Sequence, residues 1–363
     1  MQKKTVLFLV NHDVVIYNFR LELVERLIAD GHEVHISSPY GERIDDLVKL
    51  GAIYHEIKIA RHGTNPVTDG VLIWNYIKLL KQVKPDIVFS YTIKPNIYGG
   101  IACRFMNVPQ VANVTGLGTA VENPGLTQKI TLALYRFAFK KIQRIFFQNT
   151  ENRQFFIEHN LYTDKHGLLP GSGVNLERFA PLPYPEESDG IHFVFISRIM
   201  REKGIEQYLE AAAHFKESKQ HFHICGFCEA EYQGKLDEYA KNGTVIYHGM
   251  VRNVRKILAK THCTIHPSFY PEGISNVLLE SCACARPIIT TDRSGCREVV
   301  DDSVNGFVVK QRDSEDLIRK VEKFLALSHE QKMQMGLAGR AKVEREFDRQ
   351  VVVDAYLNEM ENV

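Results

Sequence analysis

The chain has 363 residues, of which 44% are hydrophobic, and its formal net charge is +1. This length suits two globular domains, each with enough apolar residues for a core of its own. No extended run of lysine and arginine interleaved with aromatic residues is present, so nucleic acid is not expected as a partner.

The cysteines and the first residues indicate the compartment. Seven cysteines, an odd number spread along the chain, do not form the pattern of a disulfide framework. The opening MQKKTVLFLVNHD has an apolar run of only six residues, which predicts a first β-strand and not a signal peptide. We therefore expect a cytoplasmic protein. Cys225 and Cys228 have redox or zinc spacing, but no second pair matches them, and buried small side chains are the preferred interpretation.

Strand and helix patterns alternate in both halves of the chain. In the first half, a strand run is followed by a helical pattern closed by Gly31 and a second strand run, which is a βαβ unit of a parallel sheet. The second half restarts this alternation. The predicted strand runs lie at residues 5–10, 33–38, 86–90, 144–149, 191–197, 221–226, 244–249, 263–268 and 287–291.

A proline-rich and acidic stretch, APLPYPEESDG, separates the halves and is typical of a linker. We predict an N-terminal domain over residues 1–175, a linker over 176–190 and a C-terminal domain over 191–345. A helical segment follows over 346–363, and packing against the first domain is one arrangement open to it. The expected fold class is α/β, with two doubly wound, Rossmann-like domains facing each other across a cleft where the carboxyl ends of both sheets bind ligands.

The segment PEGISNVLLE follows a predicted strand and carries two carboxylates, Glu272 and Glu280. After Glu272 and Gly273 a helix is expected, and its first backbone N–H groups, at Ile274–Asn276, can bind a diphosphate with the help of the helix dipole. The alternative is an ordinary capped turn from a strand into a helix.

The segment RIMREKG follows the first strand of the second half. It places Arg198 at the strand's end and Lys203 five residues later, just before Gly204 and the next helix. Two cations at the same sheet edge as Glu272 can neutralise a diphosphate together, although a solvated basic loop is the simpler interpretation of this segment alone.

Two absent motifs limit the chemistry. No G-x-G-x-x-G follows the first strand, which disfavours a dinucleotide oxidoreductase. No Asp-x-Asp occurs in the chain, so a metal bridging a nucleotide diphosphate has no obvious ligands, and Arg198 and Lys203 would take its role. We therefore expect no metal site and no cofactor.

These segments resemble a known family. SRIMREKG, PEGISNVLLESCACARPII and TDRSGCREVVDDSVNGFVV are similar to the retaining, GT-B-fold glycosyltransferases of family GT4, particularly the bacterial branch that builds capsule, O-antigen and lipid-linked glycans. SYTIKPNIYGGIA, NVTGLG and GSGVNLERFAP extend the resemblance over almost the whole chain. It implies a hexosyl or N-acetylhexosaminyl transferase with a nucleotide-sugar donor, expected to be UDP-linked, and a glycan or polyprenyl-diphosphate-linked saccharide as acceptor.

The resemblance also implies residue roles in the second half. Glu280 would hold the ribose hydroxyls, Glu272 the hydroxyls of the donor sugar, and Ile274, Ser275 and Asn276 the diphosphate. Arg198 and Lys203 would stabilise the departing nucleoside diphosphate.

Further assignments follow from the resemblance. Gly273 belongs to the donor loop, and Val251 would pack against the base through its backbone. In the N-terminal, acceptor-side domain, Arg20, Lys94 and Gly116 are the candidates for contact with the acceptor.

The chain departs from the family at two places. The first strand-to-helix loop, NHDVVIYNFR, lacks the paired glycines of many relatives, and Ile93 stands where many have a histidine near the sugar's 6-hydroxyl. Isoleucine cannot form that hydrogen bond, so we expect a 6-deoxy donor or one whose C6 group points to solvent, unless Thr92 or Lys94 supplies the contact.

The segment LYRFAFKKIQRIFF raises the question of membrane contact. Its basic residues alternate with aromatic ones, which indicates peripheral binding at the inner face of the cytoplasmic membrane; a helix buried on one face is the alternative. The basic residues are Arg136, Lys140, Lys141 and Arg144.

Two other functions share this architecture. A nucleotide-sugar 2-epimerase has the same two-domain arrangement, and a non-catalytic two-lobed binding protein also closes around a ligand. Release of nucleoside diphosphate only in the presence of an acceptor would separate transfer from both.

Overall fold

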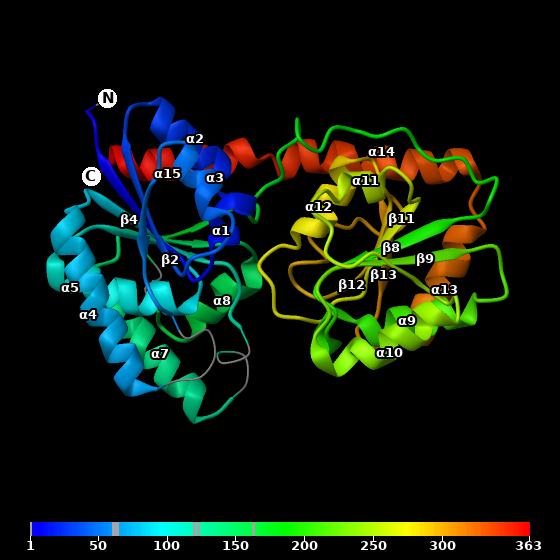
Figure 1. Ribbon diagram of the computed structural model, residues 1–363, viewed down its shortest axis with the longest axis horizontal. Coiled ribbons are helices and arrows are strands. Elements are labelled where there is room, and N and C mark those ends of the chain that lie inside the picture. Colours follow the sequence, from blue (N-terminus) through cyan, green and yellow to red (C-terminus); the bar gives the residue numbers. More distant parts are fainter. Residues whose placement is uncertain (1, 60–64, 119–120, 122–123, 162–163) are drawn as a thin grey trace. The chain divides into compact units, whose positions relative to one another are not determined.

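In a computed structural model the described residues are 2–59, 65–118, 121, 124–161 and 164–363. They divide into two units, one running to Ser172 and including Gln350–Val363, the other Gly173–Arg349 (Figure 1).

Unit 1 is built on a seven-stranded parallel sheet in the order β3-β2-β1-β4-β5-β6-β7. Its strands are almost wholly buried, as expected for a parallel sheet with helices on both faces, except for the edge strands β3 and β7. The strands are β1 (Thr5–Leu9), β2 (Glu33–Ser38), β3 (Ile53–Glu56), β4 (Ile87–Tyr91), β5 (Gln110–Val114), β6 (Arg144–Phe147) and β7 (His166–Leu168).

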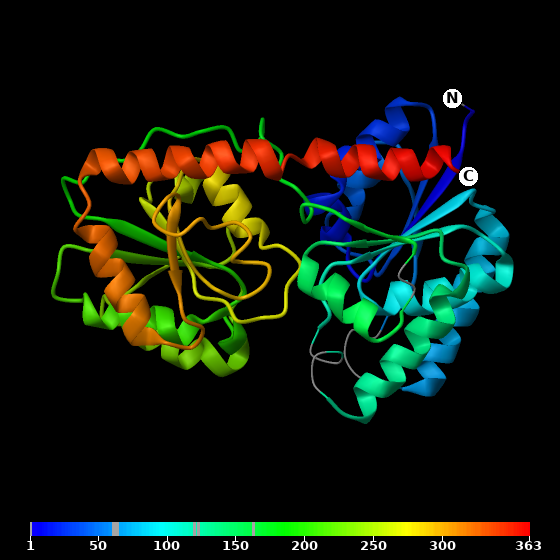
Figure 2. The same cartoon turned by 180° about the vertical axis from the view of Figure 1, so that it is seen from behind.

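One face of this sheet is covered by α1 (Asp13–Phe19), α2 (Leu21–Ala29), α3 (Ile44–Lys49) and α15 (Arg349–Glu361), the other by α4 (Pro66–Val83), α5 (Gly100–Met106), α7 (Leu126–Ala138) and α8 (Thr150–Glu158) (Figures 1 and 2). The short turns η1 (Pro95–Gly99) and η2 (Phe139–Lys141) adjoin α5 and α7.

The C-terminal helix α15 contributes to the core of unit 1. The ring of Tyr356 lies 4.9 Å from that of Phe89, and its hydroxyl accepts a 2.9 Å hydrogen bond from Asn113. Val352, Val353 and Met360 are buried beside it. The helical segment expected over 346–363 therefore packs on the first sheet.

Unit 2 repeats the design with a six-stranded parallel sheet in the order β10-β9-β8-β11-β12-β13. Helices α11, α12 and α14 cover one face, and α9, α10 and α13 cover the other (Figure 1). The elements are β8 (His192–Ile196), η3 (Arg201–Lys203), α9 (Ile205–His214), β9 (His221–Cys225), α10 (Ala230–Lys241), β10 (Ile246–Tyr247), α11 (Arg255–Leu258), β11 (Cys263–His266), α12 (Asn276–Ala283), β12 (Ile288–Thr291), β13 (Gly306–Val309), α13 (Ser314–Leu325) and α14 (His329–Glu346).

The segment predicted as a linker over 176–190 belongs to unit 2, which corrects the boundary read from the sequence. Arg286 is fully buried and donates hydrogen bonds to the carbonyl oxygens of Leu182 (3.2 Å) and Pro183 (2.7 Å). A buried guanidinium requires such acceptors, so this proline-rich strand is held against the domain. The chain passes between the units earlier, at Ser172–Gly173.

Both sheets share one topological feature. The first strand of each unit lies beside the fourth, so β1 adjoins β4 and β8 adjoins β11, and the chain runs outward in both directions from that pair. In doubly wound sheets ligands bind at the carboxyl ends of the strands at this switch point.

Among the described residues, none of the helices combines the length and the apolar character that a membrane crossing requires.

Candidate active site

The loop after β8 carries the two predicted cations. Within it, η3 is fastened to the segment that follows β11, because the N–H of Phe269 donates a 2.9 Å hydrogen bond to the carbonyl oxygen of Glu202. Gly204 allows the close approach: its φ is +78°, and a Cβ there would lie 2.1 Å from the carbonyl oxygen of Pro267. The spacing from Arg198 to Gly204 therefore brings the cations to the β8/β11 switch point.

Lys203 and Glu272 form an ion pair at this point, with only 12% and 15% of their side chains exposed. Burial lowers the pKa of Lys203 to about 7, while contact with the Glu272 carboxylate favours the charged ammonium. Glu272 is therefore the partner of a largely buried lysine.

His266, the last residue of β11, lies behind this pair. Its Nε2 is 3.2 Å from the Ser275 hydroxyl and 3.9 Å from a Glu272 carboxylate oxygen, and its Nδ1 is buried without a hydrogen-bond partner. Burial, and secondarily the charge of Lys203, lower the pKa of His266 to about 3. The imidazole is thus neutral, and Lys203 carries the positive charge here.

Arg198 is more accessible than Lys203. Half of its side chain (51%) is exposed, and its guanidinium is 3.7 Å from Glu229. The ring of Tyr270 lies under both cations, with its centroid 5.8 Å from the Arg198 guanidinium carbon and 4.8 Å from Lys203 Nζ. The structure therefore brings together three of the residues predicted to be catalytic, Arg198, Lys203 and Glu272.

Helix α12 begins at Asn276, two residues later than the sequence suggested. Ser275 is its N-cap, and the Ser275 N–H already donates a 2.8 Å hydrogen bond to the carbonyl oxygen of Gly295. Ile274 is buried in the core. The expectation of three backbone donors for a diphosphate is therefore corrected for Ser275, since the loop after β12 uses that group.

That loop also covers Gly273. At Gly295, where φ is +91°, a Cβ would lie 2.6 Å from the Gly273 carbonyl oxygen. Glu298 fixes the loop by accepting a 2.6 Å hydrogen bond from the Gly295 N–H. The donor loop is thus supported by the segment TDRSGCREVV, which carried part of the family resemblance but was given no role in the site.

Glu280 lies on α12, partly buried. Burial raises the pKa of its carboxyl group to about 7, and the charges of Arg349 and then Arg178 oppose this shift. Val251 follows Gly249, whose carbonyl oxygen accepts from Gly226 at the end of β9, and its side chain packs on the core under α12. Both residues belong to the carboxyl-edge side of unit 2.

The acceptor-side candidates of unit 1 lie on the segments that follow β1, β4 and β5, which are adjacent strands of the sheet. Arg20 is buried, with its guanidinium 4.9 Å from the Tyr91 ring and 5.7 Å from that of Tyr356, so it serves the core. Gly116 lies in the loop after β5. Ile93 packs against the core, and a Cβ on Gly118 would lie 2.9 Å from its Cδ1.

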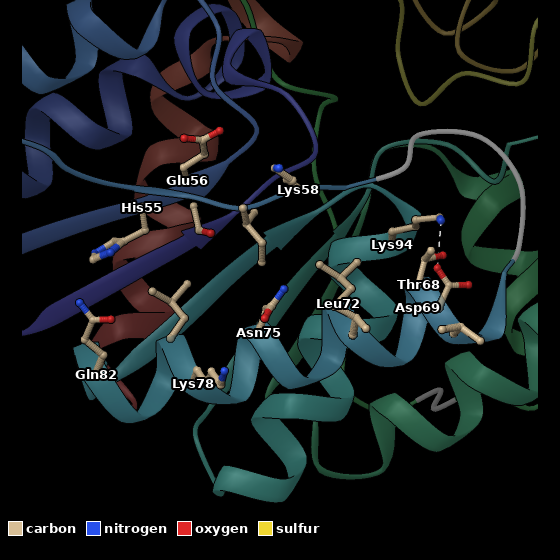
Figure 3. Close-up of a pocket in the computed structure, with 15 residues that line it drawn as sticks. His55, Glu56, Lys58, Thr68, Asp69, Leu72, Asn75, Lys78, Gln82 and Lys94 are labelled. Atoms are coloured by element: carbon tan, nitrogen blue, oxygen red, sulfur yellow. Dashed lines mark hydrogen bonds and ion pairs between the residues drawn. The ribbon is translucent and has the colours of Figure 1, made fainter.

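Lys94 lines a pocket of about 690 Å³ between α4 and the β2–β3 edge (Figure 3). Its ammonium donates a 3.0 Å hydrogen bond to Asp69, which also accepts from Tyr98 at 2.7 Å. Lys58 and Lys78 line the same pocket and were missed from the sequence, because no motif links three lysines so far apart in the chain.

Comparison with known proteins shows which family the chain belongs to. Residues 5–149 match the model "Glycosyl transferase 4-like", and residues 182–342 match "Glycosyl transferases group 1". The N,N'-diacetylbacillosaminyl-diphospho-undecaprenol alpha-1,3-N-acetylgalactosaminyltransferase of Campylobacter jejuni is 26% identical, with 96% of each chain covered. An Escherichia coli UDP-Gal:alpha-D-GlcNAc-diphosphoundecaprenol alpha-1,3-galactosyltransferase is 28% identical over 66% of each chain.

A solved structure shares the fold. Anabaena Alr3699/HepE in complex with UDP superposes with a TM-score of 0.80 at 15% identity, covering 99% of this chain and 100% of the other. Fold and site together define a nucleotide-sugar transferase of two Rossmann-like domains. The chain belongs to the GT4-type glycosyltransferases of the GT-B fold.

Proposed function

We propose that this protein transfers a hexose or N-acetylhexosamine from a UDP-linked donor to a polyprenyl-diphosphate-linked saccharide, with retention of anomeric configuration and without a divalent metal. The observation that carries the proposal is the Lys203–Glu272 pair, with Arg198 beside it, at the β8/β11 switch point. The UDP complex of the Anabaena neighbour supports uridine as the nucleoside of the donor, and the names of the two relatives support a lipid-linked acceptor.

The ion pair indicates how the donor would bind. A diphosphate arriving at Lys203 competes with Glu272 for the ammonium, and the displaced carboxylate can then accept hydrogen bonds from hydroxyls of the donor sugar. As the bond from the sugar to the diphosphate breaks, negative charge grows on the leaving group, and Lys203 with Arg198 stabilises it electrostatically. Fixed cations in this position supply what a bridging metal ion would otherwise provide.

Membrane contact at the inner face of the cytoplasmic membrane is part of the proposal, on a surface narrower than the one expected. In LYRFAFKKIQRIFF, Phe139 and Phe147 are buried and Arg144 pairs with Glu359 at 2.8 Å, whereas Arg136, Phe137 and the two lysines are exposed. We propose that these exposed residues contact the membrane together with other exposed apolar side chains of α7 and α5. Those side chains are Leu126, Ile130 and Phe105.

The test of transfer uses the purified full chain with a panel of UDP-sugars and a short-chain polyprenyl-diphosphate saccharide. We expect UDP release that depends on the acceptor, no loss with a chelator, and a product whose new anomeric carbon has the donor's configuration by NMR. UDP release of equal rate without acceptor would contradict transfer. Loss of activity with a chelator, restored by magnesium or manganese, would contradict the role of the fixed cations.

The donor's C6 group is tested with two UDP-sugars that differ only there. The absence of a hydrogen-bonding side chain at Ile93 leads us to propose that the 6-deoxy donor has the higher kcat/KM. A tenfold preference for the 6-hydroxyl form would overturn this part alone.

Membrane contact is tested by flotation with anionic liposomes at low salt. We expect the protein to float with the vesicles and a Leu126→Glu variant to float less. Protein that stays at the bottom contradicts membrane contact without affecting the proposal on transfer.

A further inference from the structure

The amino-terminal edge of the sheet in unit 2 carries a row of histidines that the transfer reaction does not use. His192 begins β8 and His221 begins β9, and the two are paired in register with their rings stacked at 4.4 Å between centroids. His223 and His248 continue the row on β9 and after β10. The Lys203–Glu272 pair lies at the opposite, carboxyl-terminal edge of the same sheet.

Asp189 is held beside this row by the turn that precedes β8. Gly190 has a φ of +107°, and a Cβ there would lie 1.8 Å from the carbonyl oxygen of Lys219, so glycine is needed for the turn to reach the start of β9. His221 Nε2 is 3.1 Å from the Asp189 carbonyl oxygen. The backbone thus fixes residue Asp189 next to both imidazoles before any ligand is present, while its exposed carboxylate can still rotate.

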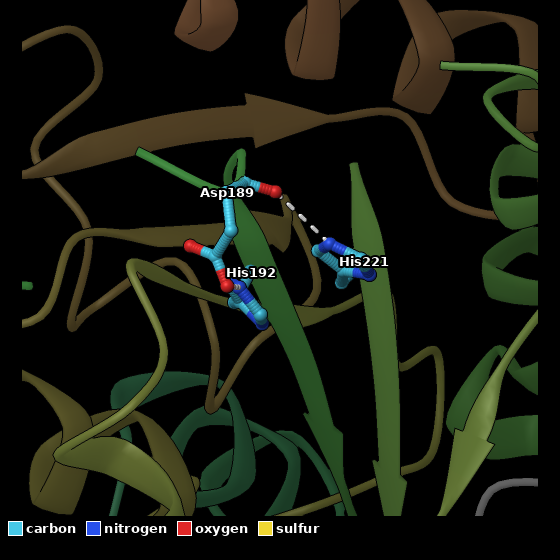
Figure 4. A group of neighbouring side chains, drawn as sticks. All are labelled: Asp189, His192 and His221. Atoms are coloured by element: carbon cyan, nitrogen blue, oxygen red, sulfur yellow. Dashed lines mark hydrogen bonds and ion pairs between the residues drawn. The ribbon is translucent and has the colours of Figure 1, made fainter. Parts of the chain in front are cut away.

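We propose that Asp189, His192 and His221 bind one divalent transition-metal ion, with zinc as the best-fitting ion (Figure 4). One ligand atom from each residue lies within 4.8 Å of the others, and Asp189 Oδ2 is 3.2 Å from His192 Nε2. Two ligand atoms at about 2.0–2.1 Å from a tetrahedral zinc are roughly 3.3 Å apart, so this pair already has the required separation.

The third ligand needs only a small adjustment. No separation in the group exceeds a tetrahedral edge by more than roughly 1.5 Å. The Asp189 side chain is 70% exposed, so it can rotate toward the second imidazole. Two imidazoles and one carboxylate form a ligand set that zinc accepts, with the fourth position open to water.

The neighbouring histidines support this site. A metal on His192 Nε2 requires that His192 Nδ1 carry the proton, and Nδ1 lies 2.9 Å from His223 Nε2, which can accept it. His223 Nδ1 in turn lies 2.9 Å from His248 Nε2. One consistent set of tautomers therefore lets His223 and His248 hold the His192 ring in the orientation that metal binding requires. Residues that hydrogen-bond to the ligands play the same part in known metal sites.

The competing arrangement is a hydrogen-bonded relay without metal, in which the tautomers run the other way and His192 Nε2–H donates to Asp189. The two arrangements differ in one measurable respect, which is affinity for added metal. Because the site lies at the edge opposite the ion pair, zinc here would fasten the 187–190 turn to β8 and β9 and leave transfer unchanged.

The experiment uses the full chain without a polyhistidine tag, freed of metal with a chelator and titrated with zinc chloride by calorimetry. We expect one zinc per chain and a higher Tm with zinc, since a ligand that binds the folded state stabilises it. Cobalt chloride should give the visible absorption of a tetrahedral ion.

Two variants and one control assign the site. Asp189→Asn and His221→Gln should each weaken zinc binding by about tenfold or more and remove the Tm shift. His214→Gln changes a half-exposed histidine on α9 that lies 3.7 Å from Glu322, and it should bind zinc as the parent protein does. Absence of one-to-one binding, or unchanged affinity in the Asp189→Asn and His221→Gln variants, would overturn the proposal.

Discussion

The two units use the same sheet topology and place opposite charge at its switch point. In unit 2, the loops after β8 and β11 bring Arg198 and Lys203 to the edge. In unit 1, the position after β1 is taken by Asp13, which is buried and accepts a 2.9 Å hydrogen bond from the Arg43 N–H. Lys94, after β4, is paired with Asp69.

This difference shows that the fold and the loop residues determine different properties of the binding site. The crossover of the chain fixes where a ligand can bind, while the side chains in the loops decide which charge it has. In unit 1, Gly41 packs directly against the Asp13 carboxylate, because a Cβ at this position would lie only 2.3 Å from it. At the unit 1 edge the chain packs closely over the Asp13 carboxylate. At the unit 2 edge the cations Arg198 and Lys203 can bind an anionic ligand.

Loss of the carboxylate in the unit 2 pair should have the largest effect. We expect Glu272→Ala to remove essentially all transfer, because the sugar hydroxyls lose their acceptor. Lys203 would remain buried without its partner, but it can release its proton, since burial already lowers its pKa to about 7. The variant should therefore fold, as circular dichroism can check.

The matched control is Glu229→Ala, which removes the 3.7 Å partner of Arg198 at the same edge. This exposed pair should contribute little, so kcat/KM should change less than about threefold. If Glu272→Ala keeps more than about a tenth of the parent activity, a loss below ~1.4 kcal/mol, the donor-contact role is wrong.

Loss of the Lys203 cation should have the second largest effect on transfer. Lys203→Met should lower kcat by about 10²-fold, the usual loss when one preorganised stabilising group is removed from a transition state. Lys94→Met in unit 1 removes a lysine already paired with Asp69, so we expect it to raise the KM for the acceptor with a smaller change in kcat. Equal losses of kcat in the two variants would erase the distinction between the units.

The sequence was sufficient to predict a parallel sheet in each half and the loops that meet at the unit 2 edge, although the strands β3, β5, β7 and β13 were not predicted. Successive buried runs separated by helical patterns fix the strands, and the carboxyl ends of parallel strands share one edge, so Arg198, Lys203 and Glu272 could be grouped before any coordinates were known.

Contacts between distant segments could not be predicted in this way. The Ser275 N–H donates its hydrogen bond to the carbonyl oxygen of Gly295, twenty positions along the chain, and no local sequence pattern predicts that bond. Arg20 was a candidate for contact with the acceptor, but α15 brings Tyr356 against it from the far end of the chain. The proline-rich segment has the composition of a linker, yet buried Arg286 holds it against unit 2.

A backbone substitution should have an intermediate effect. Gly204→Ala forces a side chain into the left-handed region and toward the Pro267 carbonyl oxygen, so it should shift η3 and destabilise the fold by about 1–3 kcal/mol. Urea denaturation measures this loss, and kcat should fall with it because Lys203 moves. Gly234→Ala on α10 meets no atom within 4 Å and is the control, expected to be neutral or stabilising by about 0.5–1 kcal/mol. A Gly204→Ala variant as stable and as active as the parent would contradict the role of this turn.

The smallest effect concerns Glu280, whose pKa is raised by burial from 4.5 to about 7. Between these values the folded protein keeps a proton that the unfolded chain has lost, so stability falls as pH rises through this window and is level above it. Glu280→Gln has no such proton, so this loss of stability does not occur in the variant. The free energy of unfolding of the variant should therefore rise relative to that of the parent from about pH 4.5 to 7.

Only the ionised carboxylate can accept from two ribose hydroxyls, so the donor affinity of the parent should rise with pH over the same window, while the donor affinity of the variant should not change. Urea denaturation and calorimetry with UDP at several pH values measure both quantities. Parallel pH profiles for the parent and the variant would show that another group titrates there, and the assignment of Glu280 to the ribose would lose its support.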